Sequence, residues 1–336
     1  MINVIGQFFG TSGYSKHTRY LSNALNKLTD VCLNVPLPQG WERDVNDKEL
    51  EMIKRKPDNE ANLIITHPVH WRINCQAKHN IVYLIWEGDK VPKWIEEEIK
   101  NPNIEKVICP SEHTYNAVPE NLREKLIIIP HGVDLDIFKP LPQEERIFTF
   151  LANKGFRNME DRGGIQYLIK AYLEEFTNEN VELMLKINPA YGLVDIPSMF
   201  PISGPTVKIL ADELTNEQLN KLYNQCDVFV SPTRAEAFNI PCLEALACGK
   251  PVITTNYGGQ TDYCDNMTGW LIDYDLVNVE HELEYEGVKW ATPKIEDLRK
   301  ALREAFELKR DFKNPRGVAE NYTWNNTATK IHELIV

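Results

Sequence analysis

Short apolar runs alternate with amphipathic stretches along the whole chain. An apolar run followed by apolar residues at helical spacing is typical of a strand followed by a helix. Its repetition is typical of a doubly wound α/β fold with a largely parallel sheet. The pattern predicts strands at 3–9, 63–66, 81–86, 106–109, 126–130, 146–152, 182–187, 206–210 and 227–231. It predicts helices at 14–28, 92–100, 112–117, 164–176, 216–224, 295–307 and 322–335.

The rhythm is interrupted near 139–142, where Pro140 and Pro142 stand in a polar stretch. Two prolines in such a context favour a linker rather than a strand or helix. We therefore expect a first domain over residues 1–140 and a second that begins at residue 141. A chain of 336 residues is long enough for two such domains.

Composition excludes several classes of partner. The formal net charge is −12, which argues against bulk attraction to nucleic acid. No apolar run is long enough to span a bilayer, and the start of the chain lacks the basic residues of a signal peptide. The seven scattered cysteines indicate small core residues in a reducing compartment, so we expect a cytoplasmic protein. Basic residues at 16–19, 27 and 54–56 would allow weak peripheral membrane contact at most; they are otherwise solvated helix faces.

The segment 231–262, SPTRAEAFNIPCLEALACGKPVITTNYGGQTD, carries the chemistry. It predicts a strand, a loop, a helix, a glycine stop at Gly249 and a second strand. Pro241 suits the first turn of the helix, where its missing N–H costs nothing. The amides of Cys242 and Leu243 would then face outward with the positive end of the helix dipole, which favours phosphate binding.

Two glutamates flank this predicted phosphate site. Glu244 lies one turn into the helix, within reach of a polyol such as a ribose, and Glu236 lies on the preceding loop. A carboxylate accepts hydrogen bonds from sugar hydroxyls. The alternative is an ordinary strand–helix unit with two surface glutamates.

The segment resembles the signature of the retaining glycosyltransferases of family four, which have the GT-B fold. The matching residues are Pro232, Thr233, Glu236, Ala237, Phe238, Asn239, Leu243–Ala247, Gly249, Pro251–Ile253, Thr255, Gly258 and Gly259. The resemblance extends to "VICPSEHTYNAV" and "IIIPHGVDLDIFKP" in the first half and to "FTFLANKGFRNMEDRGGIQYLIKAYLEEF" in the second.

The resemblance implies two facing Rossmann-like doubly wound domains with an interdomain cleft. Residues 1–140 would serve the acceptor, 141–320 would bind the nucleotide sugar, and the helix in 321–336 would cross back to the first domain. The implied activity is retaining, metal-independent transfer of a hexose or related sugar. The donor would be a nucleotide diphosphate sugar of UDP or GDP type, which is a substrate, so no cofactor is expected. The acceptor would be a glycan, a lipid-linked molecule or a small molecule. The alternatives are a non-catalytic nucleotide-sugar binder and a GT-B nucleotide-sugar epimerase.

Cations for the diphosphate are expected between the strand ending near Ala152 and the helix starting near Gly164. This loop holds Lys154, Arg157 and Arg162. By resemblance, an Arg or Lys on the loop and a lysine at the helix start clamp the diphosphate, but Gly163 stands where that lysine is usual. Arg162 or Arg157 would then replace it.

The remaining donor contacts are implied by the resemblance. Gly13, in a glycine-rich turn, would let the backbone approach phosphate closely, although a turn alone is the simpler explanation. The backbone of Ile209 and Leu210, following a strand, would read the base. Asn239 replaces a glycine and could select the sugar. The expected donor-binding set on the signature segment is Glu236, Phe238, Asn239, Ile240, Pro241 and Glu244.

Three residues are expected to be catalytic: Glu236, Glu87 and Arg162. Glu87 ends a predicted strand, where it would orient the acceptor hydroxyl or take its proton; the alternative is a helix-capping surface residue. His67 and His70 have the spacing of a metal pair but lack a third ligand, so no metal site is expected. Asp134 and Asp136 imitate a metal-binding motif inside a linker.

Overall fold

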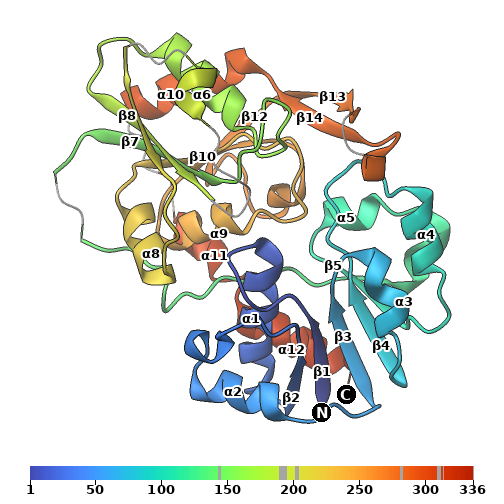
Figure 1. The fold of residues 1–336 in the computed structure, drawn as a ribbon. Coiled ribbons are helices and arrows are strands. Elements are labelled where there is room, and N and C mark those ends of the chain that lie inside the picture. The colour runs from blue at the N-terminus through green and yellow to red at the C-terminus, as the bar shows by residue number, and fades with distance from the viewer. Residues whose placement is uncertain are drawn as a thin grey trace. The chain divides into compact units, whose positions relative to one another are not determined.

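The structure is a computed structural model that describes residues 1–142, 145–188, 195–200, 204–280, 283–308, 312 and 314–335. The chain divides into two units, Met1–Gly132 with Tyr322–Val336, and Val133–Asn321. Each unit holds a parallel sheet with helices (Figure 1), so the predicted α/β class with two Rossmann-like units is confirmed.

The second unit begins before the predicted linker because the segment after Gly132 is bound to a helix of that unit. The Lys139 amide donates to Asn220 Oδ1 at 3.0 Å, and the Leu141 amide donates to Asn224 Oδ1 at 2.8 Å. Both asparagines belong to α8 (Asn216–Asn224). The prolines at 140 and 142 therefore lie inside the second unit.

In the first unit the strands pair in the parallel order β2-β1-β3-β4-β5-β6. They are β1 (Ile2–Gly6), β2 (Val31–Asn34), β3 (Ala61–Ile65), β4 (His79–Tyr83), β5 (Lys106–Cys109) and β6 (Leu126–Ile128). The helices are α1 (Gly13–Leu25), α2 (Asp47–Lys54), α3 (Trp71–Asn74), α4 (Lys93–Ile99), α5 (Glu112–Asn116) and α12 (Trp324–Ile335). Short 3-10 turns occupy Trp41–Asp44, Pro68–His70 and Glu120–Lys125.

The C-terminal helix α12 packs beside α1 in the first unit (Figure 1). Trp324 stacks on Tyr20 of α1 with ring centroids 5.8 Å apart, and Thr327 Oγ1 donates to the Pro130 carbonyl at 2.8 Å. A Cβ at Gly132 would lie 2.1 Å from the Trp324 amide, so only glycine permits this backbone approach. Both the close backbone approach at Gly132 and the Thr327 hydrogen bond therefore hold α12 against the segment that follows β6.

His17 does not belong to a basic surface patch, contrary to its place among the candidate membrane-facing residues. Its side chain is 0% exposed, and burial lowers its pKa well below the usual value, so it is neutral. Arg19, its neighbour on α1, donates to both oxygens of Glu49 at 2.8 and 2.7 Å.

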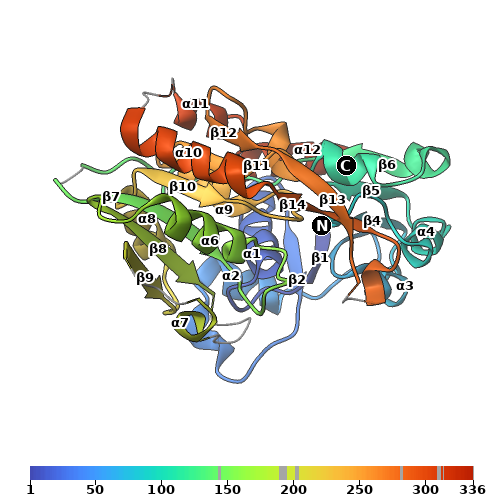
Figure 2. The same ribbon diagram turned by 90° about the horizontal axis from the view of Figure 1, so that it is seen from above.

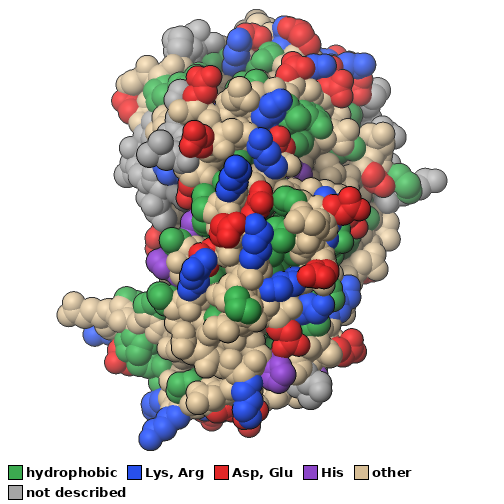
Figure 3. All heavy atoms as spheres, turned by 90° about the vertical axis from the view of Figure 1, so that its right-hand side faces the viewer, with side chains coloured by type: hydrophobic (Ala, Val, Ile, Leu, Met, Phe, Trp, Pro, Cys, Tyr) green, Lys and Arg blue, Asp and Glu red, His purple; other side chains and the backbone are tan. Residues whose placement is uncertain are grey.

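On the face shown in Figure 3, acidic and basic side chains are interspersed and hydrophobic ones form only small groups. Among the described residues no helix is long and apolar enough to cross a membrane.

In the second unit the strands pair in the parallel order β12-β11-β10-β7-β8-β9. They are β7 (Phe148–Lys154), β8 (Val181–Ile187), β9 (Thr206–Leu210), β10 (Val228–Ser231), β11 (Val252–Thr255) and β12 (Gly269–Ile272). An antiparallel hairpin follows, formed by β13 (Tyr274–Asn278) and β14 (Lys289–Pro293). The helices are α6 (Ile165–Glu175), α7 (Ile196–Met199), α8, α9 (Ile240–Ala247), α10 (Ile295–Leu308) and α11 (Pro315–Ala319), with 3-10 turns at Gly259–Asp262 and Leu283–Tyr285.

Both faces of the second sheet are covered. Val228 and Val230 of β10 lie in the core formed with α6 and α10, which pack side by side (Figure 2). Phe229, between them, packs edge-on against Tyr223 of α8 with ring centroids 5.6 Å apart. Because successive side chains of a strand point to opposite faces, α8 lies on the face opposite α6 and α10.

The chain order reverses between β7 and β10, which are neighbours in the sheet but not in sequence. In doubly wound sheets, ligands bind at the carboxyl ends of the strands at such a switch point. The loops that leave β7 and β10 therefore define the first place to search for a site.

Several elements were not predicted: β2, α2, α3, α7, β12, α11 and the β13–β14 hairpin. The hairpin departs from the strand–helix rhythm, and its strands β13 and β14 lie in a polar stretch that lacks clear apolar alternation. Several strand boundaries also differ; β1, for example, ends at Gly6 rather than at residue 9. β4 ends at Tyr83 rather than Trp86, and β7 extends to Lys154 rather than ending near Ala152.

Candidate active site

The signature segment forms the predicted strand, loop, helix and strand: β10, residues 232–239, α9 and β11. Pro241 lies in the first turn of α9, as predicted. Gly249 has φ of +75° just after the helix, which explains the glycine at the predicted stop.

The pair Gly258–Gly259 has a structural cause. The Gly259 amide donates to the Glu236 carbonyl at 2.8 Å, and a Cβ at Gly259 would lie 1.9 Å from the Ala237 carbonyl oxygen. Gly258 has φ of +102°, a conformation that side chains disfavour. The two glycines therefore let a second loop hold the backbone of the Glu236 loop.

The structure brings Lys154, Glu236 and Asn239 together. Lys154 Nζ donates to Glu236 Oε1 at 2.5 Å and to Asn239 Oδ1 at 2.8 Å. The Lys154 side chain is 5% exposed and that of Glu236 is 24% exposed. Lys154 is the last residue of β7, and Glu236 and Asn239 lie on the loop after β10. The three side chains thus meet at the switch point, with one cation and one carboxylate in contact.

Glu244, the predicted ribose contact, is buried at 1% exposure. Tyr223 Oη donates to Glu244 Oε2 at 2.7 Å and accepts from Asn153 Nδ2 at 3.0 Å. Burial, followed by the neighbouring Glu244 charge, raises the pKa of Tyr223 well above its usual value, so its hydroxyl keeps the proton. A chain from β7 through α8 to α9 therefore orients this carboxylate. Sequence reasoning singled out neither Tyr223 nor Asn153.

One of the two amides predicted to bind phosphate is already occupied. The Cys242 amide donates to the Asn239 carbonyl at 3.0 Å, closing the first turn of α9. A short turn at the helix N-terminus accounts for this, since Asn239 caps the helix in the left-handed region with φ of 69°. The prediction that both Cys242 and Leu243 present free amides is therefore wrong for Cys242.

The loop after β7 is ordered by Asp161. Its carboxylate accepts from the Arg157 amide at 3.0 Å and from the Gly163 amide at 2.8 Å. The Arg157 side chain is 53% exposed, and the Arg162 carbonyl accepts from Thr233 Oγ1 at 3.0 Å. The loop after β7 and the loop after β10 are therefore hydrogen-bonded to each other. Of the three predicted loop cations, Lys154 belongs to the strand instead.

Arg234 is a further residue of this region that the sequence analysis passed over. It is 5% exposed; its amide donates to the Arg162 carbonyl at 2.8 Å, and its Nε donates to the Ala291 carbonyl at 3.2 Å. The guanidinium also lies over the rings of Trp290 and Tyr167, 5.7 and 5.9 Å from their centroids. It joins both loops to the β13–β14 hairpin. In the sequence it looks like a surface charge.

The other predicted donor contacts are placed as follows. Ile209 and Leu210 are the last two residues of β9 and do not follow the strand; β9 is the terminal strand of its sheet, with β8 between it and β7. Phe238 is buried, and its carbonyl and that of Asn239 accept from Tyr263 Oη at 2.7 Å each. Ile240 is the first residue of α9.

Gly13 and Glu87 belong to the first unit. Gly13 is the first residue of α1, behind the N-cap Ser12. A Cβ there would meet no atom within 4 Å, and its φ is not positive, so neither packing nor backbone requires glycine.

Glu87 is 8% exposed and lies four residues beyond the end of β4, so it does not end the strand as predicted. Its carbonyl is bonded to His113 Nε2 at 2.9 Å. The capping alternative is wrong. The N-cap residue of α4 is Pro92, and among residues 1–142, all of which are described, no side chain caps that end of the helix.

The candidate metal motifs serve other contacts. His67 stacks on Trp94 with ring centroids 5.4 Å apart. Asp134 Oδ1 accepts from the amides of Asp136 and Ile137 at 3.0 and 3.3 Å, which closes a turn. In the part of the chain that the structure describes, no cluster of three His, Cys, Asp or Glu side chains could hold a metal. The seven cysteines are buried and unpaired, as expected of core residues.

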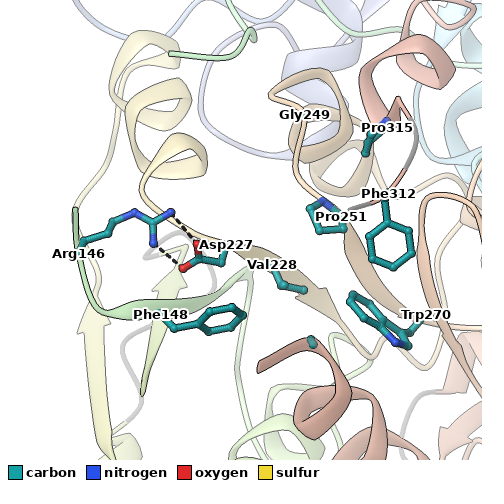
Figure 4. A pocket seen from close by; sticks show the side chains of 10 residues that line it. Arg146, Phe148, Asp227, Val228, Gly249, Pro251, Trp270, Phe312 and Pro315 are labelled. Atoms are coloured by element: carbon teal, nitrogen blue, oxygen red, sulfur yellow. Dashed lines mark hydrogen bonds and ion pairs between the residues drawn. The ribbon is translucent and has the colours of Figure 1, made fainter. Parts of the chain in front are cut away.

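A cavity of about 290 Å³ lies at the opposite edge of the second sheet, near the amino ends of β7, β10 and β11 (Figure 4). On one side Arg146 forms an ion pair with Asp227; on the other, Trp270 and Phe312 lie with ring centroids 4.6 Å apart. None of the residues that line this cavity belongs to the loop after β10, residues 232–239.

Part of the chain is similar in sequence to known glycosyltransferases. Residues 209–281 match the family model of the glycosyl transferases group 1. A probable sucrose-phosphate synthase from Thermosipho melanesiensis is 25% identical over 236 residues, which cover 67% of this chain and 50% of that protein. A D-inositol 3-phosphate glycosyltransferase from Segniliparus rotundus is 26% identical over 168 residues, 45% of this chain and 36% of that protein. The chain spans about half the length of the curated relatives it matches.

Solved structures match over nearly the whole chain. The Anabaena protein HepE in complex with UDP-glucose has a TM-score of 0.72 at 14% identity and covers 99% of this chain and 98% of its own. A sucrose-phosphate synthase from Thermosynechococcus elongatus has a TM-score of 0.67 at 18% identity, with coverage of 99% and 97%. The fold is therefore that of the GT-B glycosyltransferases. Within this class, residues 209–281 are similar to the glycosyl transferases group 1, in agreement with the resemblance of the signature segment.

Proposed function

We propose that this protein is a retaining glycosyltransferase that moves a sugar from a nucleotide diphosphate sugar, of UDP or GDP type, to an acceptor hydroxyl. The observation that carries the proposal is the contact of Lys154 with Glu236 and Asn239 where the loops after β7 and β10 meet. The complex of HepE with UDP-glucose supports a donor of this class.

The chemistry requires stabilisation of charge on both sides of the bond that breaks. The departing diphosphate gains negative charge, which the Lys154 ammonium and the guanidinium groups of Arg157 and Arg162 offset. The sugar ring gains positive charge, which the Glu236 carboxylate stabilises. A preorganised ion pair at this point requires little rearrangement when the charges develop.

The rest of the site divides by the part of the donor that it contacts. Glu244, oriented by Tyr223, accepts from the ribose hydroxyls. The first turn of α9 faces the diphosphate, and the backbone at Ile209 and Leu210 reads the base. Gly13 admits the donor or the acceptor to the start of α1, and Glu87 orients the acceptor hydroxyl. The acceptor is a glycan, a lipid-linked molecule or a small molecule.

Transfer proceeds without a divalent metal in this proposal, because lysine, arginine and the helix N-terminus supply the positive charge. The test is transfer measured with and without a chelator. Equal rates support the proposal. Loss of transfer in chelator, restored by manganese or magnesium, contradicts it and returns attention to Asp134 and Asp136.

The main experiment incubates the protein with labelled UDP- and GDP-sugars and candidate acceptors, and follows the products by chromatography and NMR. A glycosylated acceptor with the donor's anomeric configuration, together with free nucleotide, supports the proposal. An inverted product refutes retention. Binding without turnover for every donor indicates the non-catalytic binder, and a changed sugar on intact nucleotide indicates the epimerase.

A further inference from the structure

Asn239 occupies a backbone conformation that usually selects glycine. Among the described residues, Asn239 and Asn314 are the only non-glycine residues with positive φ, at 69° and 60°. Side chains other than Asn and Asp are rare in this region, because the Cβ crowds the backbone. Glycine would adopt it without strain. An asparagine at this position therefore indicates that its side chain makes contacts that glycine could not make.

The side chain of Asn239 is fully engaged in the protein. Nδ2 donates to Ser231 Oγ at 3.0 Å, and Oδ1 accepts from Lys154 Nζ at 2.8 Å. An ammonium can only donate, so the amide oxygen must face Lys154. The residue is 3% exposed. That Asn239 selects the sugar stays a prediction; in the structure its amide oxygen contacts the neighbouring cation.

The Lys154 ammonium has one more N–H donor than the two hydrogen bonds described above use. This ammonium has three protons, and two are directed at Glu236 Oε1 and Asn239 Oδ1. Among the described residues the third proton has no acceptor. Lysine is a flexible point charge on four carbons, so its direction depends on what holds it. Here two acceptors from one loop determine where the remaining proton points.

A side chain at position 163 would lie close to the loop after β7. A Cβ at Gly163 would lie 3.4 Å from the Lys154 Cβ, 3.0 Å from the Gly155 carbonyl oxygen and 3.1 Å from Asp161 Oδ1. The distances to Gly155 and Asp161 are tighter than most van der Waals contacts, and the distance to Lys154 is at the lower end of ordinary contact. Because Gly163 brings no charge, Lys154 is the cation that contacts Glu236 and Asn239.

We propose that Asn239 is a positioning residue that holds the Lys154 ammonium so that its remaining proton faces the diphosphate of the ligand. The inference rests on the proposed function for the identity of the anion, and on the Lys154 contacts for everything else. Glu236 supplies the balancing charge, and Asn239 supplies the direction without adding charge. Removal of the amide should therefore weaken contact with the diphosphate while the nucleoside contacts remain.

The experiment compares the parent with Asn239→Gly and with Asn314→Gly as a matched control. Asn314 has the same backbone conformation in the same unit, but its side chain caps α11 at the Gly317 amide. Calorimetry measures the dissociation constants of UDP and GDP, and of uridine and guanosine. For Asn239→Gly we expect the diphosphate that the parent binds to bind roughly tenfold more weakly, the scale of one hydrogen bond to a charged group. The nucleoside should bind within about twofold of the parent, and Asn314→Gly should match the parent for both.

A second measurement reads the lysine without any nucleotide. An amine-reactive reagent followed by peptide mass spectrometry measures the labelling of Lys154, which should rise in Asn239→Gly and stay low in Asn314→Gly. Unchanged labelling together with unchanged diphosphate affinity overturns the proposal. Equal weakening of nucleoside and diphosphate also overturns it, because that marks general damage to the site.

The two proposals fail differently. If the parent binds no nucleotide but labelling rises in Asn239→Gly, the proposed function fails and the positioning of Lys154 stands. If the parent binds nucleotide and neither readout changes in Asn239→Gly, the function stands and Asn239 has no such role.

Discussion

Acidification from pH 7 to pH 5 is expected to destabilise the first unit, because two buried histidines there are neutral when the chain is folded. His17 and His131 are 0% and 4% exposed, with ring centroids 4.2 Å apart. The rings of Tyr83 and Trp324 pack against them. Burial lowers the pKa of His131 to about 3. Burial, followed by the electrostatic interaction with His131, lowers the pKa of His17 well below its usual value.

The sign follows from the difference between the folded and unfolded states. The pKa of histidine in an unfolded chain is about 6.5, above that of His131 in the fold. Below that pH the unfolded chain binds more protons, so stability is lost as the pH falls from about 6.5 toward 3. At pH 5 the pKa of histidine in the unfolded chain lies about 1.5 units above the pH, so His131 lowers the free energy of unfolding by roughly 2 kcal/mol. His17 adds a loss of the same sign.

The assay is urea unfolding followed by circular dichroism at pH 7 and pH 5. His131→Phe keeps a ring in the stack but removes the proton site, so the loss of unfolding free energy between the two pH values should shrink by about 2 kcal/mol. His79→Phe is the control, because the His79 side chain is 54% exposed. The reasoning is refuted if His131→Phe and the parent lose equal stability on acidification.

Three further predictions concern the site. Glu236→Gln should reduce turnover roughly a hundredfold, because the positive charge on the sugar ring loses its carboxylate. Binding of the nucleoside diphosphate should not weaken, because the Lys154 ammonium is then no longer balanced by a carboxylate. Turnover within a few-fold of the parent would make Glu236 a structural loop residue. Glu244→Ala should weaken nucleotide binding by about 1–3 kcal/mol, whereas Tyr223→Phe, which keeps the carboxylate, should have a smaller effect; unchanged affinity in Glu244→Ala, measured by calorimetry, rules out the ribose contact. Gly13→Ala should keep the parent melting temperature, because its Cβ meets open space, yet weaken donor or acceptor binding; unchanged binding and kinetics mean that no ligand approaches there.

Much of the fold could be predicted because apolar periodicity is a local property. The strands β5 and β9 and the helix α8 have the predicted bounds. The missed elements lack that signal: β2 is four residues long, and the β13–β14 hairpin lies in a polar stretch outside the strand–helix rhythm. The boundary of the second unit was also missed, because prolines suggested a linker where hydrogen bonds to α8 hold the segment.

The candidate site divides in the same way. Glu236, Glu244 and Pro241 could be found because they lie within one short segment with a recognisable order. Arg234 and Tyr223 could not, since an arginine in a loop and a tyrosine in a helix have no distinctive spacing. Their importance comes from partners far along the chain, such as Ala291 for Arg234 and Glu244 for Tyr223.

The sequence by itself determined the α/β class, the order of the signature elements and the residue types suited to contact a phosphate and a polyol. These follow from periodicity, helix-start signals and side-chain chemistry, which are all read over a few neighbouring residues. Only the tertiary structure decided that Lys154 pairs with Glu236 and Asn239 and that His17 is neutral and buried. Each of these depends on groups tens of residues apart, whose distances and burial are set by the packing of the sheet and its helices rather than by their neighbours in sequence.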